Sequence, residues 1–531
     1  MPEFMFDHFA EFLGGYMFIA LALILFTGLP VALAVGGVAM IFGFLGIYFE
    51  VVSFREFFNV PNRIWGGDGG SGAAHNTVLV AIPCFIFMGT MLERSKVADA
   101  LLEILQVLLK RVPGGLALSV TVLGTIMAAT TGIIGASVVM MTLMALPTML
   151  KQGYNQPLAT GTLAASATLG ILIPPSIMLV LMANLMAISV GNLFLGAVLP
   201  GLLLAALYFA YILTMSTIYP HWAPPLKEGQ IEVKETNKQR KMRFLAIAVG
   251  IIVVAYGLAQ TSSSEYINWG LIGFFSLFAL SMVFGKREGN SLFGLVLKGF
   301  IPPVFLIVVV LGSIFGGWAT PTEAAGIGAF GAIILAVFNN ALSIKVLRDV
   351  CHRTALTTAM IFLIFLGATT FSYFFRALYG EDLIINFIEW LDFAPWGLLF
   401  LLMGVIFLLG FFFDFLEIIL IILPVFTPIV RFLAPEFAEH LGFDGSEPLR
   451  VVQAQVIYWF AILVAINLQT SFLTPPFGFA LFYMKGVAPK EVKMQSIYKG
   501  IIPFVGLQLI GLGMVIYWPQ ITLWLPAQLL D

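Results

Sequence analysis

Long apolar segments separated by short polar stretches run along almost the whole chain of 531 residues. Between Lys151 and Lys227 the sequence contains no Asp, Glu, Lys or Arg. Because a helix of about 20 apolar residues spans a bilayer, this stretch alone is long enough for several membrane passes. The pattern predicts an all-α polytopic membrane protein. The apolar segments lie at 15–30, 31–48, 76–92, 113–131, 133–150, 158–186, 192–216, 244–260, 267–284, 294–316, 322–338, 354–375, 395–413, 415–433, 451–473, 476–488 and 501–526.

A pair of prolines interrupts two of these segments, in GILIPPS at 170–176 and in SFLTPPF at 471–477. Proline removes a helical hydrogen bond and clashes with the preceding turn. Irregular backbone at membrane depth persists only where protein buries it or where it lines a wet cavity. The freed carbonyls can then coordinate a cation, and the half-helix beyond the break begins with a partial positive charge. A simple proline kink explains one such pair, whereas two matched pairs favour ion sites.

A polar linker at 225–243, which carries six Lys or Arg residues, divides the chain and is expected in the cytoplasm. Similar motifs follow one another in the same order on both sides of this linker. Matched interrupted segments in two halves indicate an internal repeat and a transporter binding site. The first series is FIFMG 85–89, ALP 145–147, IPPS 173–176 and LFLGAVLP 193–200, and the second is LIFLG 363–367, ILP 422–424, TPPF 474–477 and IYKGIIP 497–503.

Basic residues indicate how the two repeats are oriented. Lys110, Arg111 and Lys151 flank the first re-entrant hairpin, 113–150. Its counterpart, 395–433, has no Lys or Arg before it back to Arg376, and it ends with Arg431 and then an acidic loop. The first mouth is therefore expected in the cytoplasm and the second outside, which makes the repeats inverted. In the first half the predicted domains are scaffold helices with an amphipathic arm (1–112) and a first transport repeat (113–216, with interrupted helix 158–186). A linker and extra helix pair (217–290) follow. In the second half the predicted domains are further scaffold helices and arm (291–394) and a second transport repeat with a C-terminal helix (395–531, with interrupted helix 451–488).

The segment 93–112 has the periodicity of an amphipathic helix. Its polar positions include Glu93, Lys96, Asp99, Glu103 and Lys110. A structural arm that braces the following hairpin is the preferred interpretation, and a helix lying along the membrane interface is the alternative. The apolar face is expected to contain Val97, Leu101, Leu105, Leu108 and Leu109.

A hairpin tip is expected to face each break. In the first half the tip falls within 128–139, where Thr130, Thr131 and Gly132 supply hydroxyls and allow close backbone approach, although small residues also simply pack membrane helices together. In the second half Asp414 is an acid within an apolar run, with Glu417 on nearly the same helical face. A hydrated position at the membrane interface is the alternative for these two acids.

Two other polar motifs are interpreted as structural. Thr320, Pro321 and Glu323 have the spacing of a capping box with a favoured proline at the first helical position. The prolines of IPP at 301–303 follow a polar flank and are expected to begin a helix.

Composition agrees with a membrane protein, since 60% of residues are hydrophobic and only 10% are charged. The sequence has no GxxxxGK[ST], GxSxG or HExxH motif, so neither direct ATP use nor an enzymatic reaction is expected. Cys84 and Cys351 are far apart, and the histidines lack ligand spacing, so these residues indicate no metal site. The first residues contain Asp and Glu but no Lys or Arg, which is not typical of a cleavable signal peptide.

Four stretches resemble the DctM-type large membrane subunit of tripartite ATP-independent periplasmic (TRAP) transporters. They contain the motifs IPPS, TPTEAA and TPP in the order of that family, and together they extend over most of the chain. The additional residues 220–285, with the helix pair 244–284, resemble the longer branch of the family. The four stretches are 160–205, 316–330, 410–426 and 467–489.

The resemblance implies a sodium-coupled symporter that imports a small organic acid across the bacterial cytoplasmic (inner) membrane by an elevator movement. It implies two inverted repeats, as in the wider ion-transporter superfamily. It also implies a soluble periplasmic substrate-binding protein and a small four-helix membrane subunit (DctQ type), here expected as a separate chain. The alternative is a stand-alone sodium/carboxylate symporter or antiporter of the same superfamily.

The resemblance also implies site residues, with sodium ions as the coupling ions and no organic cofactor. The hairpin tip reads Thr-Thr-Gly here, where the family is rich in Ser and Gly. One sodium site is implied at Thr130, Thr131, Gly170, Ile173 and Pro175, and the other at Ser471, Thr474 and Phe477. Residues implied in the substrate pocket or its gating are Gly132, Ser176, Asp414, Glu417, Pro475 and Pro476.

Overall fold

The structure, a computed structural model, describes residues 12–66, 72–131, 134–225, 300–391, 393–475 and 478–529. Within these ranges the chain is helical and contains no strand. Nine helices in the same ranges are long and apolar enough to cross a membrane. The prediction of an all-α polytopic membrane protein is therefore confirmed. Nearly all of the predicted linker 225–243 and the helix pair 244–284 lie outside the described residues.

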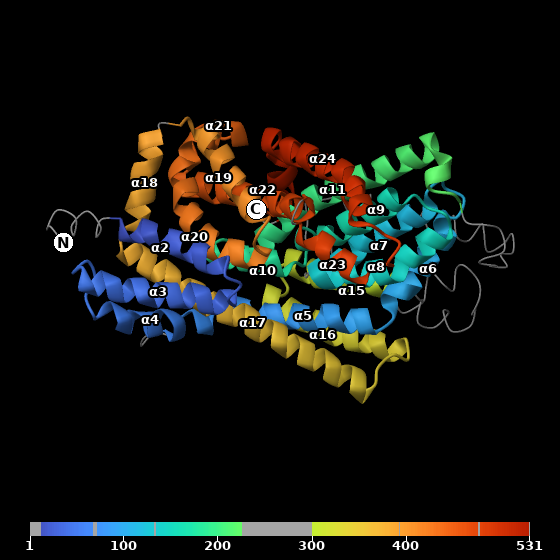
Figure 1. The fold of residues 1–531 in the computed structure, drawn as a ribbon, viewed down its shortest axis with the longest axis horizontal. Helices are drawn as coiled ribbons and strands as arrows, with labels where there is room; N and C mark the ends of the chain where they lie inside the picture. The colour runs from blue at the N-terminus through green and yellow to red at the C-terminus, as the bar shows by residue number, and fades with distance from the viewer. Residues whose placement is uncertain are drawn as a thin grey trace.

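The first half begins with three peripheral helices, which Figure 1 shows in blue at one end of the long axis. A fourth helix, a short arm, a hairpin, an interrupted helix and a long helix follow. The elements are α2 (Leu13–Leu25), α3 (Val31–Tyr48), α4 (Glu56–Trp65), α5 (Ala81–Arg94), α6 (Val97–Leu109), α7 (Gly115–Thr131), α8 (Ile134–Lys151), α9 (Gln156–Thr168), α10 (Ile177–Leu185) and α11 (Val190–Ile218).

The second half repeats this order after two preliminary helices. Long helix α17 corresponds to α5, α18 to the arm, α19 and α20 to the hairpin, α22 and α23 to the interrupted helix, and α24 to α11. The elements are α15 (Ile301–Phe315), α16 (Pro321–Phe338), α17 (Ile344–Ala377), α18 (Gly380–Leu391), α19 (Pro395–Leu409), α20 (Phe415–Leu433), α21 (Ala438–Leu441), α22 (Leu449–Leu473), α23 (Phe479–Val487), α24 (Met494–Tyr517) and α25 (Gln520–Leu529). The predicted pair of repeats, each with a hairpin and an interrupted helix, is present.

The first limbs of the interrupted helices form the centre of the molecule. Every residue of α9 from Leu158 to Thr168 is buried, as is every residue of α22 from Val456 to Leu473. By contrast, α2 and α3 leave one apolar face exposed, as helices in contact with lipid do. The first limbs of both interrupted helices are thus separated from the exposed faces by a surrounding layer of helices.

Glycines bring α9 and α24 into direct backbone contact. A Cβ atom on Gly161 would lie 2.1 Å from the carbonyl oxygen of Gly500, and a Cβ atom on Gly500 would lie 2.1 Å from that of Pro157. Any side chain at either position would push the two helices apart. This contact fixes the interrupted helix of the first repeat against the last long helix of the second.

The predicted arm 93–112 contains α6, which packs against α7 and thereby braces the first hairpin. Val97, Leu101 and Leu105 are buried as expected. Leu108, however, is 36% exposed, whereas Leu102 and Ile104 are buried. The predicted apolar face was wrong at this position, because α6 packs against neighbours on more than one side and its buried surface is broader than a single stripe.

Three local predictions can be compared directly with helix ends. The Thr320 hydroxyl oxygen accepts a hydrogen bond from the Glu323 N–H (3.3 Å), and the Glu323 carboxylate accepts one from the Thr320 N–H (2.8 Å), which confirms the capping box. The prolines after Ile301 begin α15, also as predicted. The apolar segment 501–526, in contrast, is not one helix, because α24 ends at Tyr517 and α25 begins at Gln520.

Candidate transport site

The first proline pair interrupts a membrane helix as predicted. α9 ends at Thr168, a 3-10 turn covers Leu169–Ile171, and α10 begins at Ile177. Pro174 and Pro175 lack the N–H groups that would bond the carbonyls four residues earlier, those of Gly170 and Ile171. The buried Ser176 hydroxyl donates a hydrogen bond to the Ile171 carbonyl (2.7 Å). The Gly170 carbonyl also loses the N–H group that a continuous helix would supply, and the Ser176 hydroxyl does not replace it.

The second proline pair ends α22 at Leu473, and α23 begins at Phe479. The hydroxyl of Thr474 donates to the carbonyl of Thr470 (2.8 Å), and that of Ser471 donates to the carbonyl of Leu468 (2.8 Å). Both hydroxyl oxygens keep lone pairs that can accept another bond or a cation. Pro475 follows Thr474 at the break, whereas Pro476 and Phe477 lie outside the described residues.

Each hairpin is attached to the interrupted helix of its own repeat at the same position. In the first repeat the hydroxyls of Ser166 and Thr121 lie 3.4 Å apart, which joins α9 to α7. In the second, the Asn467 carboxamide donates to the Met403 carbonyl (2.7 Å), which joins α22 to α19. Ser166 and Asn467 each lie eight residues before the first proline of their own pair.

The two hairpin tips adjoin the breaks. In the second repeat a Cβ atom on Gly410 would lie only 1.9 Å from the Ser471 hydroxyl oxygen, so the tip contacts the interrupted helix directly. In the first repeat α7 packs against the 3-10 turn of the break and ends with Thr130 and Thr131 at the tip. Gly132, the third predicted tip residue, lies outside the described residues.

Asp414 and Glu417 cap the second arm of the hairpin. An Asp414 side-chain oxygen accepts a hydrogen bond from the Phe415 N–H (2.8 Å), and the Glu417 carboxylate accepts one from the Asp414 N–H (3.1 Å). Together they form a capping box at the start of α20. An N-cap residue followed three positions later by Glu carries this signal in the sequence, at Asp414 as at Thr320.

The starts of four helices line one cavity of about 480 Å³. The first residues of α8, α10, α20 and α23 are Ile134, Ile177, Phe415 and Phe479, and all four line it. In the described part of the chain, α10 and α23 have no side-chain hydrogen bond at their N-caps. Because a helix N-terminus carries free N–H groups and a partial positive charge, the uncapped starts of α10 and α23 favour an anion, whereas the carboxylates of Asp414 and Glu417 already occupy the start of α20.

Polar side chains from two further helices also line this cavity, which we call the tip cavity. Thr90 and Glu93 come from α5, and Arg353 and Thr357 come from α17. Arg353 is therefore a positive charge beside the helix starts. The sequence analysis missed it, because nothing in the sequence shows which face of α17 lies against the hairpins.

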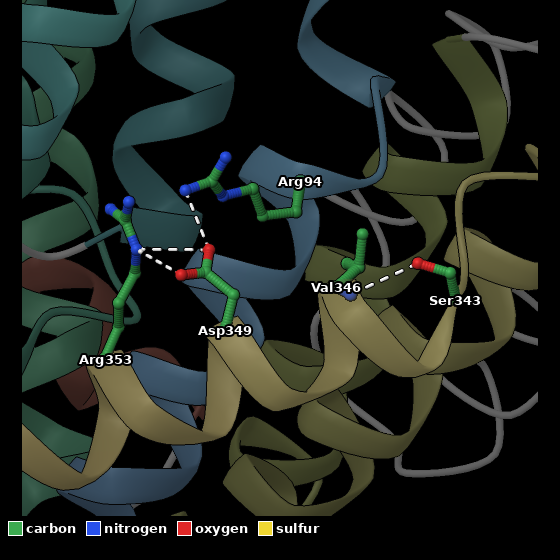
Figure 2. A network of polar contacts seen from close by, with 5 residues as sticks. All are labelled: Arg94, Ser343, Val346, Asp349 and Arg353. Carbon is green, nitrogen blue, oxygen red and sulfur yellow. Dashed lines mark hydrogen bonds and ion pairs between the residues drawn. The ribbon is translucent and has the colours of Figure 1, made fainter.

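Figure 2 shows how Arg353 is held. Asp349, one turn earlier on α17, forms an ion pair with Arg353 (3.3 Å) and with Arg94 at the end of α5 (2.8 Å). In the same view, the Ser343 hydroxyl accepts a hydrogen bond from the Val346 N–H (3.2 Å) and caps the start of α17. One carboxylate thus serves two guanidinium groups, which leaves hydrogen-bond donors of Arg353 for a ligand.

A buried polar contact joins the two interrupted helices. The Gln469 carboxamide on α22 lies 3.3 Å from the Thr168 hydroxyl on α9 and 3.3 Å from the Tyr208 hydroxyl on α11. All three residues are fully buried. The sequence analysis did not single out any of them, because their meeting depends on how the repeats pack together.

The second limbs of the interrupted helices cross between the repeats. α10 packs against α20, the hairpin arm of the second repeat, and α23 packs against α8, the hairpin arm of the first. The tip cavity is consequently enclosed by both halves of the chain.

A sequence profile described as the DctM component of tripartite ATP-independent periplasmic transporters matches residues 18–521. The chain belongs to this family. The resemblance found in the sequence is thereby confirmed. Because the relatives are TRAP transporter permeases, the chain is a transport protein and not an enzyme.

Two relatives and one solved structure extend this result. The C4-dicarboxylate TRAP transporter large permease protein DctM of Pseudomonas aeruginosa is 26% identical over 84% of this chain and 86% of its own length. The isethionate TRAP transporter permease protein DctMQ of Oleidesulfovibrio alaskensis is 26% identical over 94% of this chain, which spans 64% of that relative. The YdaH transporter of Alcanivorax borkumensis shares the fold, with a TM-score of 0.50 and 12% identity over 94% of this chain and 98% of that one.

Proposed function

We propose that this TRAP permease subunit imports a small organic acid together with sodium ions across the bacterial cytoplasmic membrane. The observation that carries the proposal is the arrangement of helix ends. Helix N-termini line the tip cavity, whereas the C-terminal ends of α7, α9, α19 and α22 lie at the hairpin tips and breaks. Partial positive charge favours an anionic substrate at the first place, and partial negative charge favours cations at the second.

The first sodium ion is proposed to lie at the tip of the first hairpin. The Gly170 carbonyl supports this position, because Pro174 cannot supply its usual hydrogen bond. The remaining proposed ligands are backbone or hydroxyl oxygens of Thr130, Thr131, Ile173 and Pro175.

The second sodium ion is proposed to lie at the matched break. Ser471 occupies the position equivalent to Gly170, four residues before the first proline, and its hydroxyl contacts the hairpin at Gly410. Thr474 contributes a second hydroxyl oxygen, and Phe477 is proposed to contribute its backbone carbonyl.

The substrate is proposed to be a carboxylate held in the tip cavity. Its volume of about 480 Å³ falls in the usual range for small-ligand sites. The helix starts would receive the carboxylate, with Arg353 also lining the cavity. Four other residues would act indirectly, because they form the break and the hairpin cap that set the shape of the cavity. These residues are Ser176, Asp414, Glu417 and Pro475.

Transport is proposed to proceed as an elevator movement. The hairpins and interrupted helices would move together against α5 and α17 once sodium and substrate have ordered the tips. A membrane potential of about 100 mV contributes about 2.3 kcal/mol for each positive charge that enters. Entry of the bound sodium ions down their electrochemical gradient therefore supplies the work for uptake, reduced by the cost of moving the negatively charged carboxylate in the same direction.

A soluble periplasmic binding protein is proposed to deliver the substrate, and a small four-helix membrane subunit to support the moving parts. The relative named DctMQ is longer than this chain, which spans 64% of it. We interpret the remainder of that relative as the equivalent of the small subunit.

The test is uptake by proteoliposomes that contain this chain and its small subunit, with the cognate binding protein and a panel of labelled carboxylates. Uptake is expected to require an inward sodium gradient and the binding protein. Uptake that is unchanged when potassium replaces sodium would contradict the coupling. Uptake that needs no binding protein would contradict the proposed delivery.

A variant at the second break separates the ion site from the substrate site. Thr474→Val removes one proposed ligand and is expected to raise the sodium concentration for half-maximal uptake several-fold, with the substrate KM at saturating sodium little changed. Thr217→Val, which removes a hydroxyl from an exposed position near the end of α11, is the control. An unchanged sodium dependence in Thr474→Val would exclude this ligand.

A further inference from the structure

A second polar cavity, of about 310 Å³, lies at the other end of α17. We call it the distal cavity. It is separate from the tip cavity, since the two share no lining residue. Its polar lining residues are Arg63, Asn184, Thr369, Ser372, Tyr373 and Arg376.

The two cavities lie between the same helices. α10 lines the tip cavity with Ile177 at its start and the distal cavity with Asn184 near its end. α20 lines the tip cavity with Phe415 and the distal cavity with Leu420. Both cavities thus occur where α10 and α20 face α17, at successive levels along that long helix.

The side chains of α17 that line the two cavities are partly apolar, and they include an arginine at each level. Arg353 and Thr357 line the tip cavity, and Ser372 and Arg376 line the distal cavity. A carboxylate that moves along α17 would therefore meet a guanidinium group at both levels. Arginine binds carboxylates well, because its planar fork offers two parallel N–H donors.

The guanidinium groups of the distal cavity retain donors for a ligand. The Arg63 guanidinium lies 5.8 Å from the centre of the Tyr373 ring, a cation–π contact that uses no N–H group. No carboxylate in the described part of the chain forms an ion pair with Arg63. Arg376 uses its Nε to pair with Glu381 (2.7 Å), which leaves its terminal nitrogens.

The other carboxylate near this cavity is already hydrogen bonded. Glu56 accepts hydrogen bonds from the Tyr373 hydroxyl and from the Asn59 carboxamide, the latter at 3.0 Å. These bonds hold the pKa of Glu56 below its ordinary value, so it remains ionised. The contact also fixes Tyr373, the ring on which Arg63 rests.

We propose that the distal cavity is a second binding site for a carboxylate anion, with Arg63 and Arg376 as its charged groups. It would hold the organic acid at the end of α17 opposite to the tip cavity, before or after its stay there. The inference rests on the proposed function, because it assigns the same substrate class to a second level of the same path.

One introduced cysteine reports both the electrostatic environment of the distal cavity and whether a ligand occupies it. Cys84 and Cys351, the free cysteines of the described residues, are replaced by Ala, and Ser372→Cys is introduced. The full chain with its small subunit in nanodiscs is then treated with thiol reagents of equal size and opposite charge. The negative reagent is expected to react faster than the positive one.

Removal of one guanidinium group from the distal cavity should weaken the preference for the negative reagent. Arg63→Gln is expected to lower the ratio of negative-reagent to positive-reagent rates about fivefold, the effect of one nearby unit charge at a hydrated site. Arg55→Gln, at an exposed position just before α4 that does not line the cavity, is the matched control. A ratio that is the same in Arg63→Gln and Arg55→Gln overturns the proposal.

Occupancy is tested with the carboxylates that the uptake assay identifies, and with succinate as a fixed probe. Protection of Cys at position 372 that is lost in Arg63→Gln supports the proposal. Protection by added phosphatidylglycerol but by no carboxylate would assign the cavity to lipid and overturn it. Because labelling does not require sodium or uptake, this result is independent of whether sodium coupling is confirmed.

Discussion

Gln469 on α22 lies 3.3 Å, carboxamide nitrogen to hydroxyl oxygen, from Thr168 on α9, although 301 positions separate them in the sequence. Each of the two residues stands six positions before the first proline of its own pair. The interrupted helices therefore touch at equivalent points, in a contact that is completely buried. It is a direct physical connection between the two proposed sodium sites.

Replacement of Gln469 by Leu should weaken this connection. We expect the Hill coefficient for sodium-driven uptake to fall towards 1, because binding at one break would no longer bias the other through the shared contact. Loss of the buried hydrogen bonds should also reduce stability by about 1–3 kcal/mol. Thr168→Val should reproduce the change in Hill coefficient. An unaltered coefficient in both variants would show that this contact does not carry the coupling.

Gly410 permits the second hairpin tip to touch the broken helix. Gly410→Ala should reduce uptake more than tenfold while the protein still folds, because the new methyl group would occupy the position of the Ser471 hydroxyl. Gly404→Ala on the same helix α19 is the matched control, since no heavy atom of the described residues lies within 4 Å of its would-be Cβ atom. Partial recovery in Gly410→Ala/Ser471→Gly would confirm the contact, and equal effects of the two single alanine variants would refute it.

Asp414 is predicted to act as a helix cap. Asp414→Asn keeps an oxygen that can accept the Phe415 N–H and should retain most stability and uptake. Asp414→Ala should lower the free energy of unfolding by about 1 kcal/mol, and it should also lower uptake, because the cap forms one wall of the tip cavity. If Asn and Ala abolish uptake equally without affecting stability, the negative charge itself is required.

Glu56 connects α4 to α17 through the Tyr373 hydroxyl. Because the hydrogen bonds from Tyr373 and then Asn59 lower its folded-state pKa, Glu56 contributes stability above its unfolded pKa that is lost as pH falls through the lowered value. The attachment of α4 should therefore loosen only in acid, and Tyr373→Phe, which removes the hydroxyl that Glu56 accepts from, should loosen it already at neutral pH and flatten its pH dependence. Hydrogen exchange of α4 between pH 3 and pH 6 measures it, and identical profiles for Tyr373→Phe and the parent would contradict the account.

The interruptions could be predicted from the sequence because proline acts locally. The adjacent prolines Pro174 and Pro175 remove two successive helical hydrogen bonds and end the helix, whereas single prolines such as Pro147 and Pro200 remain inside α8 and α11. The preference of proline for the first turn also placed the helix starts at Ile301 and Pro321. The Asp414 cap was also readable from its spacing to Glu417, although its depth in an apolar run made a free acid the more attractive interpretation.

Contacts between distant segments could not be predicted in this way. Arg353 and Asp349 are one helical turn apart, so their pairing follows from spacing, but the participation of Arg94 depends on how α5 packs beside α17. Leu108 was misplaced for the same reason, since the neighbours of α6 determine which side is buried.

The short limbs α10 and α23 each rest on the hairpin of the opposite repeat. Neither repeat forms the tip cavity alone, so a change in the proposed selectivity of this cavity cannot be confined to one repeat. Duplicated halves of this kind remain mutually dependent, and each constrains how far the other can diverge.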